Sequence, residues 1–436
     1  FTLPNRRYDR SSLSGALKVE VYVDGKLSQT LTNLSAGAKS ATNAITLSDG
    51  SHKAVFYCYD SNGRKSVAAE ISVWGGKDVA GKVENVSVSV TPRGDVATLS
   101  WSAPSGSKSG GNYDAAGVTY KVIRRPDGVT VADGLTSTTL TDTPARKMLL
   151  SQYEIYAVTS DGESDPYYTT PMLIGAAVEP PYLETFDTAQ GFNTFTIIDT
   201  NGVGHYEGDR WMWYGNNREA IYWLDSYYNA ADAWLITPTI NLNADDVYRL
   251  SFSTRGYSTG DFFEFTLSAH VGDLPTVAGQ KREIMRVVNK HSKEYVNYHG
   301  FFTAEKGDCR VGFHLVSPGT DHRGLDNIRV AYYGPSTIPA APSVVSTGMT
   351  DGAVNIRVKA PSTDTKGRAI KSLTNLRLYR TGSSMPIATL TDGVSPGATV
   401  VISDNEPVFG DNAYTITATN ADGQGLEAEV TVNTKA

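Results

Sequence analysis

The chain has 436 residues, a formal net charge of −7 and 40% hydrophobic residues. This length suggests about three domains, and the apolar content is enough for a buried core in each. The sequence has no basic stripe, which argues against nucleic acid as a partner, and no apolar run long enough to span a bilayer. Alternating apolar and polar residues, bounded by Gly, Asn, Asp and Pro, dominate the chain, so we predict an all-β fold.

Two strand patterns near the start of the chain recur twice further along. The first is an alternating strand that follows a proline, and its copies are residues 19–23, 120–124 and 376–380. The second is an alternating strand that ends on Asn-Gly or Asp-Gly, which is typical of a tight turn. Its copies are residues 54–63, 153–162 and 414–423. Similar units in series predict several β modules, which favours display or binding over a single catalytic core.

This pattern resembles the fibronectin type III module, a sandwich of about seven strands in about 100 residues. The second copy shows the resemblance best, with Trp101 in an early strand and Tyr120 in the next. The third copy lacks the tryptophan, and the first has Phe1 at that place, so the first module is expected to lack its opening strand. The resemblance implies three fibronectin-like modules, over residues 1–79, 80–179 and 335–436.

The second module carries the integrin-binding tripeptide, Arg93-Gly94-Asp95. It lies between two predicted strands, residues 86–90 and 96–99. An ordinary tight turn uses the same residue types. We therefore interpret the tripeptide as the turn that joins these two strands.

Residues 180–334 break the repeat. They hold six of the seven histidines and four of the six tryptophans, which marks a different kind of domain. Its predicted strands are residues 248–252, 263–267, 311–315 and 328–330. The segment is too long for one more fibronectin-like module, and an antiparallel jelly roll fits these strands better.

This segment resembles the cleaved-adhesin domain, also called choice-of-anchor J, of gingipain proteases and many bacterial surface proteins. The resemblance rests on residues 184–187 (ETFD), 232–238 (DAWLITP) and 325–328 (LDNI). It implies a jelly roll in an extracellular, cell-surface or outer-membrane-anchored bacterial protein. The acidic loop that the family often has corresponds to residues 199–204, where two of its three acids are missing.

Three carboxylates of this segment predict a metal site. Asp326 alternates with Ile328, and Glu184 with Phe186, so both acids should face the core. The first and last strands of a jelly roll commonly lie side by side, which would bring Glu184 and Asp326 together, with Asp187 close by. Clustered carboxylates with backbone carbonyls suit Ca²⁺, so we predict structural calcium. The alternative is that these acids pair with an arginine such as Arg329 or cap a turn.

Aromatic residues crowd the first half of the same segment. Exposed aromatic rings stack on sugar faces, and jelly rolls include many lectins. The alternative is core packing, because tryptophan is mostly buried in proteins. The residues predicted to bind a ligand are Trp211, Trp213, Tyr214, Tyr222 and Trp223, and the others in this region are Tyr206, Tyr227, Tyr228 and Trp234.

No sequence pattern indicates catalysis. The chain has no His-Glu-x-x-His, no Gly-x-Ser-x-Gly elbow and no phosphate-binding glycine loop. Cys58 and Cys309 each alternate with apolar residues, which predicts two buried free thiols. We therefore expect a non-catalytic adhesin whose jelly roll binds a host or matrix protein, with the fibronectin-like modules as spacers. The alternatives are a carbohydrate-binding module for a surface glycan, an architectural stalk, or the non-catalytic part of a larger secreted protease.

Overall fold

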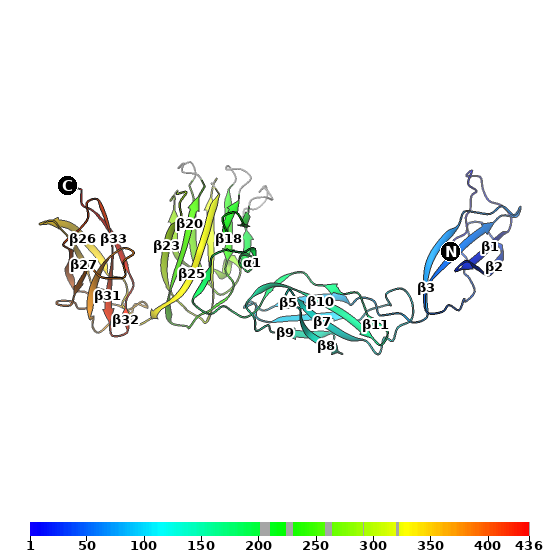
Figure 1. Ribbon diagram of the computed structural model, residues 1–436, viewed down its shortest axis with the longest axis horizontal. Helices are drawn as coiled ribbons and strands as arrows, with labels where there is room; N and C mark the ends of the chain where they lie inside the picture. Colours follow the sequence, from blue (N-terminus) through cyan, green and yellow to red (C-terminus); the bar gives the residue numbers. More distant parts are fainter. Residues whose placement is uncertain (201–209, 224–229, 258–263, 291, 320–321, 436) are drawn as a thin grey trace. The chain divides into compact units, whose positions relative to one another are not determined.

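The computed structural model describes residues 1–200, 210–223, 230–257, 264–290, 292–319 and 322–435 (Figure 1). Within these ranges the helical elements are the four-residue α1 (Ala189–Phe192) and the 3₁₀ turn η1 (Val277–Gly279). Within the described residues no helix is long and apolar enough to cross a membrane. The named strands pair in antiparallel sheets, so the predicted all-β fold is confirmed.

The chain forms two compact units. The first comprises Phe1–Val90, Val96–Thr143 and Leu150–Ile174, and the second comprises Thr91–Asp95, Pro144–Leu149 and Gly175–Ala436. Four separate clusters of buried apolar side chains lie along the chain. The two units do not follow the four predicted module boundaries, which stay a prediction.

The first cluster lies under a single sheet. Its strands are β1 (Leu17–Val23), β2 (Lys26–Leu34), β3 (Gly50–Tyr59) and β4 (Ala69–Gly75), in the order β2-β1-β3-β4. Opposite this sheet the chain forms only isolated bridges, such as Thr2 with Lys39. Cys58 is half-buried rather than buried as expected, because only coil covers this side of the sheet.

The second cluster lies between two sheets, as the fibronectin-like pattern predicts. The three-stranded sheet, in the order β5-β6-β9, has β5 (Glu84–Val90), β6 (Ala97–Ser102) and β9 (Thr139–Asp142). The other sheet has β7 (Thr119–Arg125), β8 (Val129–Leu135), β10 (Leu149–Thr159), β11 (Gly162–Glu163), β12 (Tyr167–Tyr168) and β13 (Met172–Ile174). The Arg93 turn joins β5 to β6, and there Arg93 pairs with Asp95 at 3.2 Å.

The last cluster has the same arrangement of two sheets. One sheet, in the order β26-β27-β30, has β26 (Ser343–Thr350), β27 (Ala353–Lys359) and β30 (Thr399–Asp404). The other has β28 (Asn375–Arg380), β29 (Ala388–Leu390), β31 (Asp411–Asn420), β32 (Gly423–Gln424) and β33 (Ala428–Asn433).

The repeated strands found in the sequence pair in the same register in all three copies. The last pair of the shared ladder is Val23 with Ala54, Arg124 with Tyr153, and Arg380 with Tyr414. The turn after the second strand is also shared, since the amides of Ser66, Ser164 and Gly425 each donate back to that strand, to the carbonyls of Cys58, Ala157 and Ala418. The paired strands of the three copies are therefore equivalent in register as well as in sequence.

In the second module three side chains join the two sheets. Arg124 on β7 donates to Asp142 at the end of β9 over 2.5 Å, and the Tyr153 hydroxyl on β10 donates to the same carboxylate oxygen over 2.8 Å. The side chains of Arg124 and Asp142 are only 6% and 8% exposed. We call this Arg–Asp–Tyr arrangement the sheet-bridging triad.

The last module has the same sheet-bridging triad. Arg380 donates to Asp404 over 3.1 Å and the Tyr414 hydroxyl donates to the same oxygen over 2.8 Å. Here the arginine is more open, with 38% of its side chain exposed, and it also donates to the carbonyl of Glu406. The aspartate remains buried, at 4% exposed.

The jelly roll of the segment 180–334 has two sheets around the largest cluster (Figure 1). The first sheet, in the order β16-β17-β25-β20-β23 with β14 also on β25, has β14 (Tyr182–Glu184), β16 (Arg210–Tyr214), β17 (Glu219–Trp223), β20 (Asp246–Gly256), β23 (Val296–Thr303) and β25 (Arg323–Pro335). The second, in the order β15-β18-β24-β21-β22 with β19 also on β24, has β15 (Thr196–Asp199), β18 (Ala231–Ile236), β19 (Ile240–Asn241), β21 (Thr266–Gly272), β22 (Arg282–Val288) and β24 (Asp308–Ser317).

Candidate ligand-binding site

The first and last strands of the jelly roll lie side by side, as the metal-site argument assumed. β14 pairs with β25, and Glu184 stands opposite Ile328. Glu184 is half-buried, and its Oε1 accepts from the backbone amide of Phe186 over 2.7 Å. Its carboxylate lies so close to Gly191 of α1 that a side chain there would collide with it, so α1 closes over this acid.

Asp326 does not face the core as predicted. The pairing of β25 with β20 is irregular between Ser251 and Ser253, and Asn327 has a positive φ of 52°. The bulge inserts a residue and breaks the alternation on which the prediction relied. Asp326 consequently stands opposite Ser253, on the outer face of the sheet, while Leu325 and Ile328 both stay in the core.

The three predicted carboxylates affect one another without closing into one group. Burial raises the pKa of Asp326 to about 6, and the charges of Glu219, Asp187 and Glu184 add to this increase. Burial also raises the pKa of Glu184, with a further contribution from Asp187. Asp187 itself is exposed and lies 3.7 Å from Arg218. Among the described residues, only His299, Glu427 and Glu429 bring three metal-ligand atoms within 4.8 Å of one another.

Two of the predicted ligand-binding aromatics are core residues. Trp211 is 1% exposed and Tyr222 is 0% exposed. They pair across β16 and β17 and touch edge to face, with ring centroids 5.7 Å apart. They face inward because they alternate with the outer residues of both strands. The prediction that Trp211 and Tyr222 meet a ligand is therefore wrong, and core packing accounts for them.

Trp213 shares the inward face of Trp211 and is only partly buried against the core. Its Nε1 donates to the carbonyl of Phe186 over 2.8 Å. This bond ties β16 to the segment after β14, next to the predicted carboxylates. Trp213 thus stabilises the edge of the jelly roll.

Tyr214 and Trp223 lie on the outer face of the first sheet. Both are half-buried, with ring centroids 5.9 Å apart. His322, which immediately precedes β25, stacks on Trp223 at 4.2 Å between centroids and 15° between planes. Tyr257, just beyond β20, meets the same imidazole edge to face at 5.9 Å. Four rings from separate parts of the chain therefore form one aromatic surface.

A buried acid supports this aromatic surface. The side chain of Glu219 is 0% exposed and accepts two hydrogen bonds from Arg255, from Nη2 at 2.7 Å and from Nε at 3.1 Å. The hydroxyls of Tyr257 and Tyr295 donate to its two oxygens. Arg255 lies between the two tyrosine rings, at 4.9 and 4.8 Å from their centroids, so the cation and the rings hold each other in place.

The protonation states of this group follow from these contacts. Burial acts to raise the pKa of Glu219, but the hydrogen bonds from Arg255, Tyr257 and Tyr295 outweigh it and lower the pKa. Burial and the bond to Glu219 raise the pKa of Tyr257 to about 12. The acid is therefore ionised and the phenol protonated at neutral pH. Four donors occupy the two carboxylate oxygens, so Glu219 positions its neighbours and has no free oxygen for a ligand.

We call the set Tyr214, Glu219, Trp223, Arg255, Tyr257, Tyr295 and His322 the outer-face cluster. Sequence reasoning selected two of these residues and missed the rest. One signal was present, since Glu219 alternates with Ile221 and Trp223 and therefore shares the face of that tryptophan. No sequence pattern connects β17 with Arg255 or Tyr295.

The second sheet carries a different aromatic group. Trp234 stacks on His314 at 4.1 Å and lies 5.0 Å from His270, and it is only 5% exposed. His314 is held by Asp232 at 2.8 Å. The faces of Trp234 are therefore largely occupied by the protein itself. Tyr206, Tyr227, Tyr228 and most of the predicted acidic loop lie outside the described residues.

Comparison with known proteins gives weak likenesses. No family model matches the chain, and no curated protein matches it. The K1 cleaved adhesin domain of Lys-gingipain from Porphyromonas gingivalis is similar at 12% identity over 35% of this chain and 98% of that one, with a TM-score of 0.28. The TmCBM61 module, solved with β-1,4-galactotriose, is similar at 16% identity over 34% and 95%, with a TM-score of 0.25. The FN1–FN3 domains of chicken CNTN1 are similar at 13% identity over 82% and 100%, with a TM-score of 0.19.

These neighbours include adhesin and fibronectin domains, the two classes that the sequence resembles, and carbohydrate-binding modules, which the sequence analysis gave as an alternative function. At such TM-scores the likenesses carry no conclusion about what this chain binds. The functional argument therefore rests on the side chains of the jelly roll.

Proposed function

We propose that the chain is a non-catalytic binding protein whose jelly roll binds a glycan at the outer-face cluster. The observation that carries this proposal is the half-exposed stack of Tyr214, Trp223 and His322, held against the buried Glu219–Arg255 pair. The stack offers flat apolar ring faces, and the adjoining turn offers the exposed amides of Asn216 and Asn217.

This combination matches what a sugar requires. The C–H face of a pyranose packs on aromatic rings, and its hydroxyls need hydrogen-bonding groups at the rim. Asn217 donates to the Tyr257 hydroxyl over 2.8 Å, so the rim amide is already oriented toward the rings. Rings held by Arg255 and Glu219 lose little entropy on binding, because their positions are set before the ligand arrives.

The same contacts argue against a catalytic role for Glu219. A general acid must carry a proton near neutral pH, but the pKa of Glu219 is lowered by its donors. A nucleophile or base needs a free lone pair, and the oxygens of Glu219 are already shared by Arg255 and two phenols. Binding without chemistry is the function that this geometry supports best.

A glycan array with the full chain tests the proposal. Trp223→Ala should abolish binding of a glycan that the unchanged protein retains. Tyr332→Ala is the matched control, because Tyr332 is a 54% exposed aromatic of the same jelly roll outside the cluster. Glycan binding that survives Trp223→Ala would contradict the proposal. Binding of a matrix protein that survives the change, without any glycan binding, would favour the adhesin alternative.

We also propose that Ca²⁺ stabilises the edge where β14 meets β25, with Glu184, Asp187 and Asp326 as its acidic ligands. The support is the pairing of β14 with β25, which brings Glu184 near Asp326, and the raised pKa of both acids, which burial causes and neighbouring carboxylates increase. Glu184 stands opposite the core residue Ile328, whereas Asp326 is on the outer face, so the ion would have to lie at the β14 edge and draw both Asp187 and Asp326 toward it. A melting temperature of the jelly roll that is the same in EDTA and in CaCl₂ would reject this proposal.

A surface location completes the proposal. We infer that the protein is displayed outside the cell, with the fibronectin-like modules as spacers that carry the jelly roll away from its attachment. The support is the resemblance of the segment 180–334 to bacterial surface adhesin domains, read from three short motifs of the sequence. Protease treatment of intact cells should remove the protein, and complete protection in intact but not in lysed cells would contradict this location.

A further inference from the structure

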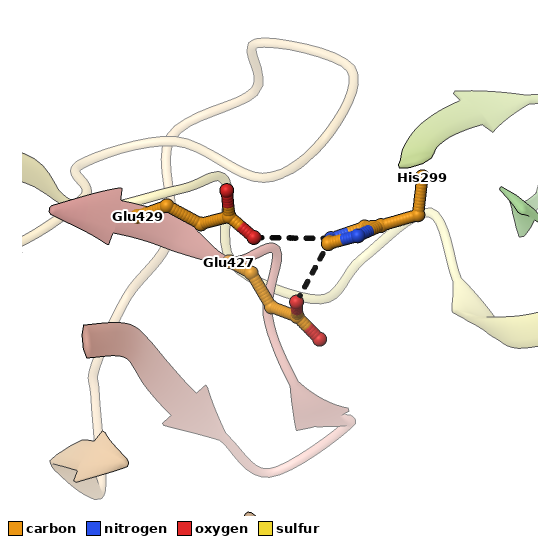
Figure 2. Close-up of side chains that lie close together, drawn as sticks. All are labelled: His299, Glu427 and Glu429. Atoms are coloured by element: carbon orange, nitrogen blue, oxygen red, sulfur yellow. Dashed lines mark ion pairs between the residues drawn. The ribbon is translucent and has the colours of Figure 1, made fainter. Parts of the chain in front are cut away.

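Three potential metal ligands meet where the jelly roll contacts the last module, both within the second compact unit (Figure 2). His299 comes from β23, Glu427 from the residue before β33, and Glu429 from β33 itself. The Nε2 atom of His299 lies 3.2 Å from Oε2 of Glu427 and 3.6 Å from Oε1 of Glu429. Figure 2 shows both carboxylates directed toward this one nitrogen.

The strand geometry explains why the two acids point the same way. Side chains two apart on a strand project to the same face, and β33 is held in register against β31, with Glu429 opposite Thr415. His299 stands opposite Ser251 of β20. All three ligands are therefore carried at or beside hydrogen-bonded strands, which fixes their separation better than loops would.

The contact around these ligands is itself well built. The Tyr333 hydroxyl, at the end of β25, donates to the carbonyl of Gly425 over 2.7 Å. Phe301 packs on Tyr333 at 4.6 Å between centroids and meets His299 edge to face at 5.6 Å. The amide of Leu426 donates to the carbonyl of Pro339 over 2.9 Å. The Tyr333 bond thus holds the segment that carries Glu427 next to the jelly roll, and the Leu426 bond fixes that segment within the last module.

Two carboxylates face a single imidazole in this group. Glu427 is only 14% exposed, and its carboxylate lies 3.2 Å from Nε2 of His299. Nε2 of a neutral imidazole can donate to one of the two carboxylates only, and a protonated imidazole balances one negative charge of two. A divalent cation at the centre would balance both carboxylates and accept the nitrogen lone pair.

We propose that His299, Glu427 and Glu429 bind Zn²⁺ and that this ion fastens the jelly roll to the last module. Zinc takes imidazole nitrogen and carboxylate oxygen at about 2.0–2.2 Å in a tetrahedron, so neighbouring ligand atoms lie about 3.4 Å apart. The two observed distances from Nε2 of His299 to the carboxylate oxygens, 3.2 and 3.6 Å, lie on either side of this expected ligand–ligand distance. A water molecule completes the fourth position.

The ligand set also selects the class of metal. Ca²⁺ and Mg²⁺ are hard cations that take oxygen ligands, whereas imidazole suits zinc and its transition-metal neighbours. A zinc ion at His299 is therefore distinct from the calcium proposed at β14, and neither depends on the other or on a glycan at the outer-face cluster.

Calorimetric titration of the chelator-treated full chain with ZnCl₂ tests this site. We expect one tight site in the unchanged protein, a higher melting temperature on adding zinc, and no competition from CaCl₂. Glu429→Gln should weaken binding more than about tenfold, and His299→Ala should do the same. Because Glu429 is 57% exposed, its substitution leaves the fold intact and keeps the test valid even if His299→Ala unfolds.

His52→Ala is the matched control, because His52 is paired with a single carboxylate, Asp24, at 2.6 Å. The His52→Ala variant should bind zinc with the affinity of the unchanged protein. The proposal is overturned if the unchanged chain has no stoichiometric zinc site, or if Glu429→Gln and His299→Ala both bind zinc with unchanged affinity.

Discussion

The second and last modules differ from the first in one arrangement of side chains. Both complete sandwiches have the sheet-bridging triad, with the arginine and tyrosine paired on neighbouring strands and the aspartate on the opposite sheet. In the first module the paired positions hold Val23 and Ala54 instead. This module has neither the arginine nor the tyrosine, and its second sheet is reduced to isolated bridges.

The comparison indicates what an apolar core alone achieves. Fewer side chains are buried in the cluster of the first module than in those of the other two, and Val67 and Ile71 stay exposed. A buried ion pair adds specificity of packing more than net stability, but its removal from one side is costly because the remaining charge has no partner. We therefore expect the triad to fix the position of one sheet over the other.

The largest effect should follow from removing the aspartate of the second module. Asp142→Ala removes the acceptor of two buried donors, the Tyr153 hydroxyl and the guanidinium of Arg124, which is 6% exposed and keeps Asp127, so we expect a loss of about 3–5 kcal/mol. Hydrogen exchange measured by mass spectrometry should show faster exchange in β7, β9 and β10. Asp133→Ala, at an exposed position of the same module, is the control. Equal exchange in both variants would show that the triad does not hold the sheets together.

The equivalent change in the last module should cost less. Asp404→Ala also removes the acceptor of an arginine, but 38% of the Arg380 side chain already meets water. The Arg380 charge left without its acceptor is partly solvated, so we expect a loss of stability of about 1–3 kcal/mol. The same exchange experiment measures it in β28, β30 and β31. A loss as large as that of Asp142→Ala would mean that arginine burial does not decide the cost.

The difference in stability between the first and second modules should be measurable in the unchanged chain. In a urea series, we expect the amides of β1 and β3 to lose protection at a lower concentration than those of β7 and β10. The physical reason is that local opening is easier where fewer apolar contacts are buried. Simultaneous loss of protection in the two modules would indicate that the single sheet of the first module is as cooperative as a sandwich.

The smallest effect concerns alkaline pH. Burial and the bond to Asp404 raise the pKa of Tyr414, so above about pH 10 the unfolded chain loses this phenol proton while the folded module keeps it. Stability is then fully present below pH 10 and falls as pH rises further. Tyr414→Phe should cost about 1 kcal/mol at pH 8 and flatten that fall. Tyr8→Phe, at a fully exposed residue, should leave the pH profile unchanged.

Most of the fold could be predicted from sequence, because period-two alternation and turn residues are local signals. The predicted strands at residues 120–124 and 153–157 coincide with β7 and β10, and those at residues 311–315 and 328–330 lie inside β24 and β25. The error at Asp326 came from the same rule. One inserted residue at Asn327 moves the side chain of Asp326 to the other face of the sheet. No residue type in that stretch predicts a bulge.

The candidate site was only partly predictable, because it is made by contacts across strands. Trp223 and Tyr214 were found as members of an aromatic-rich stretch, whereas Trp211 and Tyr222 in the same stretch are buried. Composition gives the aromatic content of a strand but not which face is covered. The order of strands in the sheet brings Glu219 to Arg255, and the contact between two modules brings His299 to Glu427. Neither arrangement is visible in the sequence.

Strand β25 also determines how the protein responds to a pulling force. It ends at Pro335, and Ile338 just beyond it is already buried, so the chain passes from the jelly roll into the last module with little slack. The chain enters the jelly roll at β14, which pairs antiparallel with β25, so Tyr182 stands opposite Val330 near the end of β25. A pull between the entry and the exit therefore peels β14 from β25 one bond after another, and the jelly roll should open first at this edge. Optical-tweezers extension of the full chain measures this, and a first step that releases the whole jelly roll at once would contradict it.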